Sequence, residues 1–204
     1  MSLDRLPFNW FDLVLVAVLI MGIFRGRKRG MSEELMPVLQ WVGIVIACSI
    51  AYQPLGVWLA DVSLMSQLMG YLVAYLVTAA GVALAFVLFK RALHGKLIGS
   101  DAFGKAEYYL GMPAGMLRFG CVLFAGLALL NAPLYTQQEI QNYKEYQMKN
   151  FDSEFFPGLQ SLQAYVFEKS LTGPLIKKHL DFLLIKPTVS TRGKQLKQKE
   201  WIGP

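Results

Sequence analysis

The chain is poor in the side chains that build disulfides and metal centres. Its 204 residues include only two cysteines and two histidines. Cys48 and Cys121 each lie inside an apolar run, where a thiol behaves as a small hydrophobic side chain. Neither belongs to a CxxC pair or has a suitably spaced histidine nearby. We therefore expect no disulfide, no metal site and no bound cofactor.

The common catalytic signatures are missing as well. HExxH, GxSxG and the phosphate-binding GxxxxGKS/T do not occur. His94 lies in a basic stretch and His179 in an amphipathic one. No serine, cysteine or carboxylate accompanies either histidine in a pattern typical of nucleophilic or acid–base catalysis. The sequence therefore predicts a protein that is not an enzyme.

Charge is absent from one long apolar run, Leu68–Phe89, which Lys90 and Arg91 close. At about 1.5 Å of rise per residue, a helix of this length spans the roughly 30 Å hydrocarbon core of a bilayer. Apolar residues make up 54% of the chain and the mean hydropathy is +0.39, both high for a soluble domain. The net charge of +6 comes without a basic stripe interleaved with aromatic residues. We expect the lipid bilayer as a partner and no nucleic acid.

Four apolar runs are candidates for membrane crossings. They are Phe8–Phe24, Leu35–Tyr52, Leu68–Phe89 and Leu110–Leu130. We expect the second run to end before Pro54, because proline interrupts a helix. Residues 1–133 are thus predicted to form an all-α integral membrane domain, a four-helix transmembrane bundle.

The distribution of basic residues predicts the orientation of these runs. Lys and Arg follow the first and third runs, whereas Asp61 is the only charged residue between the second and the third. Short cytoplasmic loops retain Lys and Arg, so both basic loops are predicted to face the cytoplasm. Both termini then lie on the non-cytoplasmic side.

The chain becomes more polar after Pro133. Residues 134–186 are predicted to form an amphipathic helical segment on the non-cytoplasmic side, in which Leu159, Leu162 and Val166 make one apolar stripe. This segment could lie on the membrane surface or pack on the outer end of the bundle, and we favour the second arrangement. Residues 187–204 have little apolar content and are predicted to be a basic mobile tail.

Glycines recur at helical spacing from the first run into the basic stretch that follows it, and again in the last run, where they would allow two helices to approach closely. They are Gly22, Gly26, Gly30, Gly111 and Gly115. Packing within one chain and self-association into a homo-oligomer are both compatible with this pattern.

Arg118 lies about 12 Å along a helix that starts at Leu110, where an unpaired guanidinium would be costly. Glu33, Glu34 and Glu107 lie on the same predicted side and are candidate partners. Such a polar cluster would either fix the register of the helices or form part of a pathway for an ion or solute. Asp12, at the start of the first run, is expected to cap that helix.

Several short motifs occur in an order that resembles the colicin V production protein family. The pattern comprises NWFD ending at Asp12, GRKRG from Gly26 through Arg29 to Gly30, then Glu34, Trp41, Gly111, Gly115 and Arg118. The resemblance covers residues 9 to about 130. The chain departs from the family pattern at Glu107, where an aspartate is usual, and at Phe119, which separates Arg118 from Gly120.

The resemblance implies a multi-pass protein of the bacterial inner membrane, linked to colicin V production and to envelope function. We therefore expect a non-catalytic factor that supports the envelope or toxin production and secretion through other membrane or envelope proteins. The alternative is a small oligomeric transporter or channel that uses Arg118 with Glu33, Glu34 or Glu107. A weaker third interpretation is a lipid-interacting protein whose basic loops recruit anionic headgroups.

Overall fold

The computed structural model describes residues 9–63, 65–92, 104–135, 141 and 158–189, and this part of the chain is almost entirely helical. Three long helices dominate it: α1 (Trp10–Ser63), α2 (Gln67–Ala92) and α3 (Glu107–Asn131). Each is long and apolar enough to cross a membrane. The shorter elements are η2 (Gly104–Ala106), β1 (Pro133–Leu134), α5 (Leu159–Phe167), α6 (Thr172–Leu180), η3 (Asp181–Leu183) and β2 (Thr188–Val189). The expectations of helical structure and of membrane-spanning helices are confirmed.

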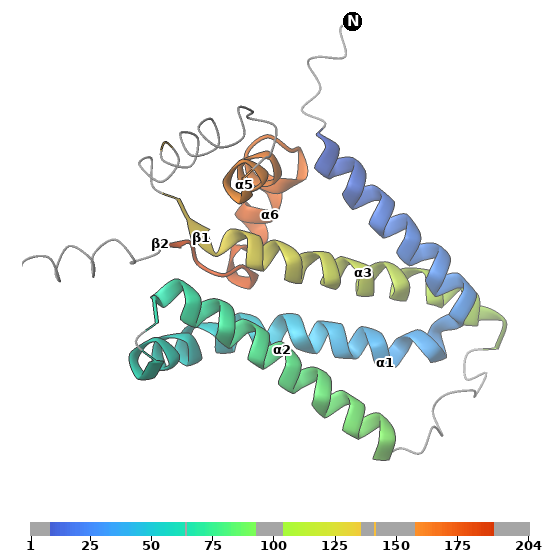
Figure 1. The fold of residues 1–204 in the computed structure, drawn as a ribbon. Helices are drawn as coiled ribbons and strands as arrows, with labels where there is room; N and C mark the ends of the chain where they lie inside the picture. Colours follow the sequence, from blue (N-terminus) through green and yellow to red (C-terminus); the bar gives the residue numbers. More distant parts are fainter. Residues whose placement is uncertain (1–8, 64, 93–103, 136–140, 142–157, 190–204) are drawn as a thin grey trace, which may run out of the picture.

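α1 is broken at Gly30, where φ is 80° and ψ is 171°. A positive φ favours glycine, because a side chain would clash with the backbone in this conformation. The break divides α1 into a first arm, residues 10–29, and a second arm, residues 31–63. Figure 1 shows that the two arms fold back from the bend and that α3 lies between them. Consecutive long segments therefore run in opposite directions.

The second arm of α1 extends further than predicted. The helix continues through Pro37 and Pro54 to Ser63, so the expectation that it ends before Pro54 is wrong. Packing explains the difference, because Gly56 lies directly against Tyr71 and Gly70 at the start of α2. These tertiary contacts outweigh the roughly 3 kcal/mol that a proline costs inside a helix.

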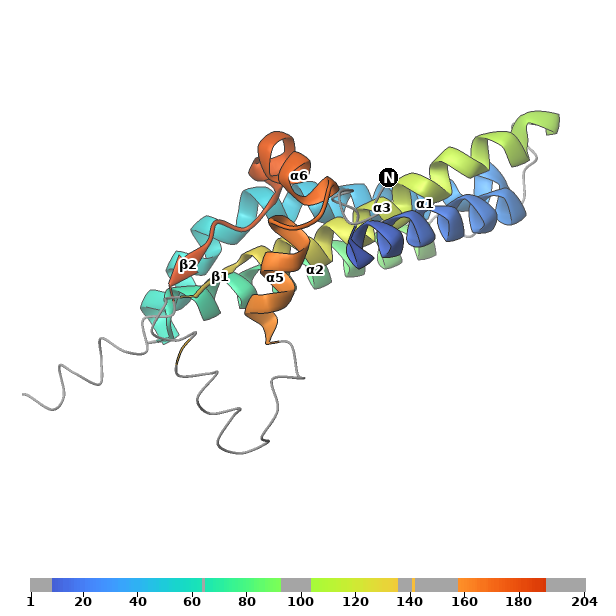
Figure 2. The same ribbon diagram turned by 90° about the horizontal axis from the view of Figure 1, so that it is seen from above.

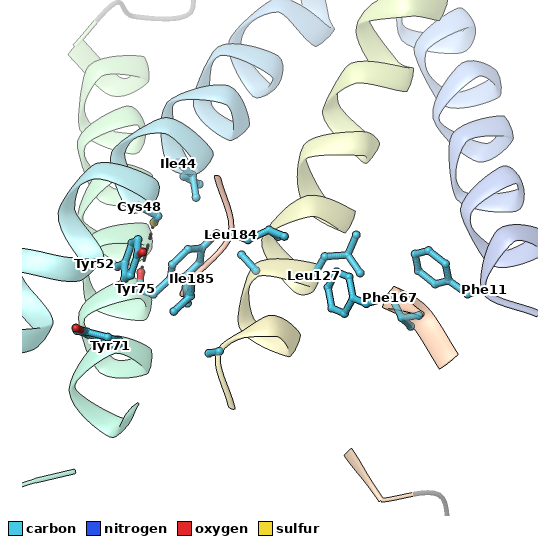
Figure 3. Close-up of a cluster of buried hydrophobic side chains, with 13 residues drawn as sticks. Phe11, Ile44, Cys48, Tyr52, Tyr71, Tyr75, Leu127, Phe167, Leu184 and Ile185 are labelled. Atoms are coloured by element: carbon cyan, nitrogen blue, oxygen red, sulfur yellow. Dashed lines mark hydrogen bonds between the residues drawn. The ribbon is translucent and has the colours of Figure 1, made fainter. Parts of the chain in front are cut away.

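The buried apolar core lies away from the Gly30 bend, towards the end where the C-terminal elements join the long helices (Figures 1 and 3). Leu184 and Ile185 are 1% and 0% exposed. Figure 3 places them between a group from α1 and α2, which includes Cys48 and Tyr75, and the group around Leu127. The segment that follows η3 therefore fills the space between the long helices at this end.

Hydrogen bonds hold the C-terminal elements in place. The Asn131 side-chain Nδ2 donates to the Ile185 carbonyl at 3.0 Å, and the Lys186 amide donates to the Tyr52 hydroxyl at 3.3 Å. β1 and β2 add a short parallel pair. Figure 2 shows α5 and α6 gathered at this end, away from the Gly30 bend. The described part of residues 134–186 thus packs on the long helices.

The apolar stripe predicted for residues 159–166 is divided between core and surface. Val166 is 2% exposed and Phe167 is 3% exposed, whereas Leu159 at the start of α5 is 65% exposed. Of the predicted tail, Thr188–Val189 forms β2. Residues 190–204 of that tail, like Phe8 of the first predicted run, lie outside the described residues.

Candidate functional site

The first arm of α1 contacts α3 through glycines, at backbone-to-backbone distance. A Cβ atom added to Gly22 would lie 2.8 Å from the Gly115 carbonyl oxygen. At Gly26 it would overlap the Gly111 carbonyl oxygen, and at Gly111 and Gly115 it would overlap the carbonyl oxygens of Gly26 and Gly22. The five glycines singled out in the sequence therefore meet within one chain, and larger side chains would push the helices apart.

Glu107 lies at the break in α1. It is 6% exposed, and its Oε1 accepts a hydrogen bond of 2.6 Å from the Ser32 amide at the start of the second arm. A Cβ atom on Gly30 would lie 2.7 Å from Glu107 Cγ. Glycine at position 30 therefore serves two purposes: it permits the positive φ and leaves room for the Glu107 side chain. The carboxylate in turn stabilises the positive, N-terminal end of the second arm.

Glu34 is the centre of the charged cluster. Its side chain is 0% exposed and lies between two arginines. Arg118 Nη1 is 3.0 Å from Glu34 Oε2 and 3.3 Å from Oε1, and Arg29 Nη1 is 3.4 Å from Oε1. Both arginines are partly exposed, at 21% for the Arg118 side chain and 36% for Arg29. The buried carboxylate of the second arm is therefore compensated from the first arm, by Arg29, and from α3, by Arg118.

The structure distinguishes between the three glutamates proposed as partners of Arg118. Glu34 pairs with it, Glu107 bonds to the second arm of α1, and Glu33 is exposed and forms no ion pair with a described arginine. The sequence reasoning missed the contribution of Arg29 to Glu34. Trp41, another position of the family motif, packs half-buried against the apolar core.

Asp12 connects two helix N-termini. It is 2% exposed, and its Oδ2 accepts hydrogen bonds from the amides of Asn9 and Leu171, both at 3.1 Å. Its Oδ1 accepts from the Thr172 amide at 3.2 Å and from the Thr172 hydroxyl at 2.6 Å. Asp12 therefore caps α1, as its position in the sequence indicates, and also the start of α6. The second contact joins residues 160 positions apart, and no local pattern could have predicted it.

A comparison with protein-family models matches residues 11–164 to the family described as Colicin V production protein. The chain belongs to this family. The resemblance noted in the sequence is confirmed, and the match extends beyond residue 130 into α5. Searches of curated proteins and of solved structures found no match.

Membership and the long apolar helices together show that this colicin V production family member is a membrane protein linked to colicin V production. The matched range contains the glycine contact, the Glu34 cluster and Asp12, and it ends before Thr172, the partner of Asp12. The family is not known for enzymatic activity. Within the described residues, no group of three His, Cys, Asp or Glu side chains is arranged to hold a metal ion.

Beside the charged cluster, the surface of this family member is hollowed into a groove of about 490 Å³. Residues of the first arm and of α3 form its walls: Met21, Phe24, Arg25, Lys28, Arg29 and Phe119. The groove thus combines a basic end with an apolar wall. The sequence reasoning recognised the basic residues as a membrane flank and did not place Phe119 beside them.

Proposed function

We propose that this member of the colicin V production family is a non-catalytic, multi-pass protein of the bacterial inner membrane that acts through other membrane or envelope proteins. The pairing of Glu34 with both Arg29 and Arg118 carries the proposal. A carboxylate with no exposed surface and two ion partners fixes the relative positions of the helices. This role fits a scaffold that presents surfaces to partners.

Four membrane crossings are part of this proposal. The break at Gly30 divides α1 into arms of 20 and 33 residues, and about 20 helical residues suffice to cross the hydrocarbon core. Basic residues lie near the bend, at Arg25, Lys28 and Arg29, and at the end of α2, at Lys90 and Arg91. Figure 1 places the bend and the end of α2 on the same side of the molecule. The positive-inside rule assigns this side to the cytoplasm and both termini to the other side.

The C-terminal elements offer a surface for a partner. Leu159, Leu175 and Phe182 are 65%, 53% and 71% exposed, although they lie on elements too short to cross a membrane. Exposed apolar side chains on such elements are available for contact with another protein or with a membrane. We place the envelope partner here.

Site-specific photocrosslinking in native membranes tests this proposal. A photoreactive residue at Leu159 or Phe182 is expected to form adducts with a distinct protein, and the same residue at Val166, which is 2% exposed, is the matched control. Adducts with lipid alone, or none above the Val166 control, would contradict the partner surface.

The alternative, a small oligomeric transporter or channel, rests on the partial exposure of Arg118 beside a buried carboxylate. Polar groups of this kind at membrane depth often mark solute paths. Flux of ions and small solutes into liposomes would be compared between the parent and Arg118→Gln. Specific flux that the substitution abolishes would support a transporter, and no flux from a folded parent would exclude the assayed solutes.

A further inference from the structure

The groove beside the charged cluster is amphiphilic along one face of the first arm of α1. Lys28 and Arg29 lie three and four residues after Arg25, so each of them neighbours Arg25 on the helix surface. Met21 and Phe24 line the groove about one turn before them and are 55% and 64% exposed. Basic and apolar walls thus face the same space.

Positive charge at the groove exceeds the negative charge available nearby. Glu34 is the acidic partner of both Arg29 and Arg118, and it is fully buried. Arg25 and Lys28 are exposed and form no ion pair with a described acidic side chain. Arginine donates paired hydrogen bonds to phosphate oxygens, and lysine supplies a compact positive charge. The basic end is therefore suited to a phosphate group.

The apolar wall indicates which kind of phosphate-containing molecule fits the groove. Met21 and Phe24 belong to a helix long and apolar enough to cross a membrane, and Phe119 adds an aromatic ring from α3. An inorganic phosphate ion would contact only the basic end. A phospholipid would use the whole groove, with the headgroup on Arg25 and Lys28 and an acyl chain along Met21, Phe24 and Phe119.

We propose that this groove is a binding site for an anionic phospholipid. The inference rests on the proposed placement of the bend at a membrane surface, and it adds a specific site to the general attraction between basic loops and anionic headgroups. The lipid would pack against both the first arm and α3 beside their glycine contact.

Native mass spectrometry of the full-length protein in detergent tests the site. The protein is titrated with phosphatidylglycerol and with phosphatidylcholine of the same acyl chains, and the fraction carrying one lipid is measured. The parent is expected to prefer phosphatidylglycerol. Arg25→Gln with Lys28→Gln is expected to weaken its binding roughly thirtyfold, the combined effect of two basic residues at an anionic surface.

The matched control is Lys90→Gln with Arg91→Gln, which removes the same charge from exposed positions at the end of α2. This control is expected to leave the preference intact, and Arg25→Lys with Lys28→Arg is expected to retain binding. If the two glutamine variants lose phosphatidylglycerol binding equally, the effect comes from overall charge and the proposed site is wrong. So would a parent without lipid preference.

Inorganic phosphate distinguishes the two sources of the anion. In large molar excess it is expected to leave most of the phosphatidylglycerol bound, because phosphate cannot replace the contacts with Met21, Phe24 and Phe119. Displacement of the lipid by inorganic phosphate would overturn the lipid assignment. These outcomes are independent of photocrosslinking at the C-terminal surface, so this inference and the partner proposal can fail separately.

Discussion

Replacing Glu34 by glutamine removes the carboxylate that Arg29 and Arg118 share. The side chain keeps nearly the same shape and one acceptor oxygen, but its charge is lost where it has no exposed surface. Breaking a buried pair by removing one partner costs about 3–5 kcal/mol when the remaining charge stays buried. Arg118 is 21% exposed and Arg29 is 36% exposed, so both can regain part of their hydration. We therefore expect Glu34→Gln to lower the free energy of unfolding by about 2–3 kcal/mol.

The assay is reversible unfolding in mixed micelles, followed by circular dichroism. The matched control is Glu33→Gln, which makes the same chemical change at the preceding, exposed residue. An exposed substitution of this kind usually changes stability by less than about 0.5 kcal/mol. A Glu34→Gln variant as stable as Glu33→Gln would refute the reasoning.

A double variant separates the ion pair from the packing of either side chain. When both partners of a buried pair are replaced by apolar side chains of similar volume, stability is often unchanged or increased. Glu34→Met combined with Arg118→Met is therefore expected to be more stable than Glu34→Met alone, by about 1 kcal/mol or more. Strictly additive effects of the two substitutions would show that the contact between Glu34 and Arg118 contributes no coupling energy.

Three further predictions concern the helix contacts. Gly26→Ala is expected to cost about 1–3 kcal/mol in the same unfolding assay, because its Cβ would overlap the Gly111 carbonyl oxygen. The control is Gly81→Ala, which should be neutral or slightly stabilising, because a Cβ at this position would meet nothing within 4 Å. Gly30→Ala should cost at least about 1 kcal/mol, because it combines a positive φ with a contact against Glu107, and an unchanged stability would contradict the described bend. Asp12→Asn should speed hydrogen exchange in α5 and α6 more than in α3, whereas Asp61→Asn, at an exposed position, should change neither.

The sequence predicts the apolar helices well because their signal is local. The length of an uncharged run such as Leu68–Phe89 can be compared directly with the thickness of the hydrocarbon core. The helix α2 extends this run by only a few residues. The end of the second arm of α1 could not be predicted in the same way. Pro54 signals a stop, but the contact of Gly56 with Tyr71 and Gly70 comes from α2 and outweighs that signal.

The candidate site shows the same division between local and distant information. An unpaired arginine inside a membrane is costly, so the position of Arg118 within an apolar run predicts an acidic neighbour. The choice of Glu34 over Glu33 and Glu107 depends on the register between α1 and α3. The close approach of Gly26 to Gly111 fixes that register, and glycine spacing alone does not reveal which pairs meet. The hydrogen bond between Asp12 and Thr172 depends on how the C-terminal elements fold back onto the long helices, and the local sequence does not predict that arrangement either.

The distribution of buried polar groups bears on the choice between a scaffold and a transporter. Glu34 and Glu107 lie near the Gly30 bend, whereas Asp12 and Asn131 lie towards the end covered by the C-terminal elements. Between these two levels, the buried side chains of the second arm are apolar: Val38, Ile44, Val45 and Cys48. A path for ions or polar solutes needs polar groups at successive depths, because an isolated charge in an apolar medium is costly. In the described residues, the polar groups at each end bond to the protein's own helices, an arrangement that favours a scaffold acting through its surfaces.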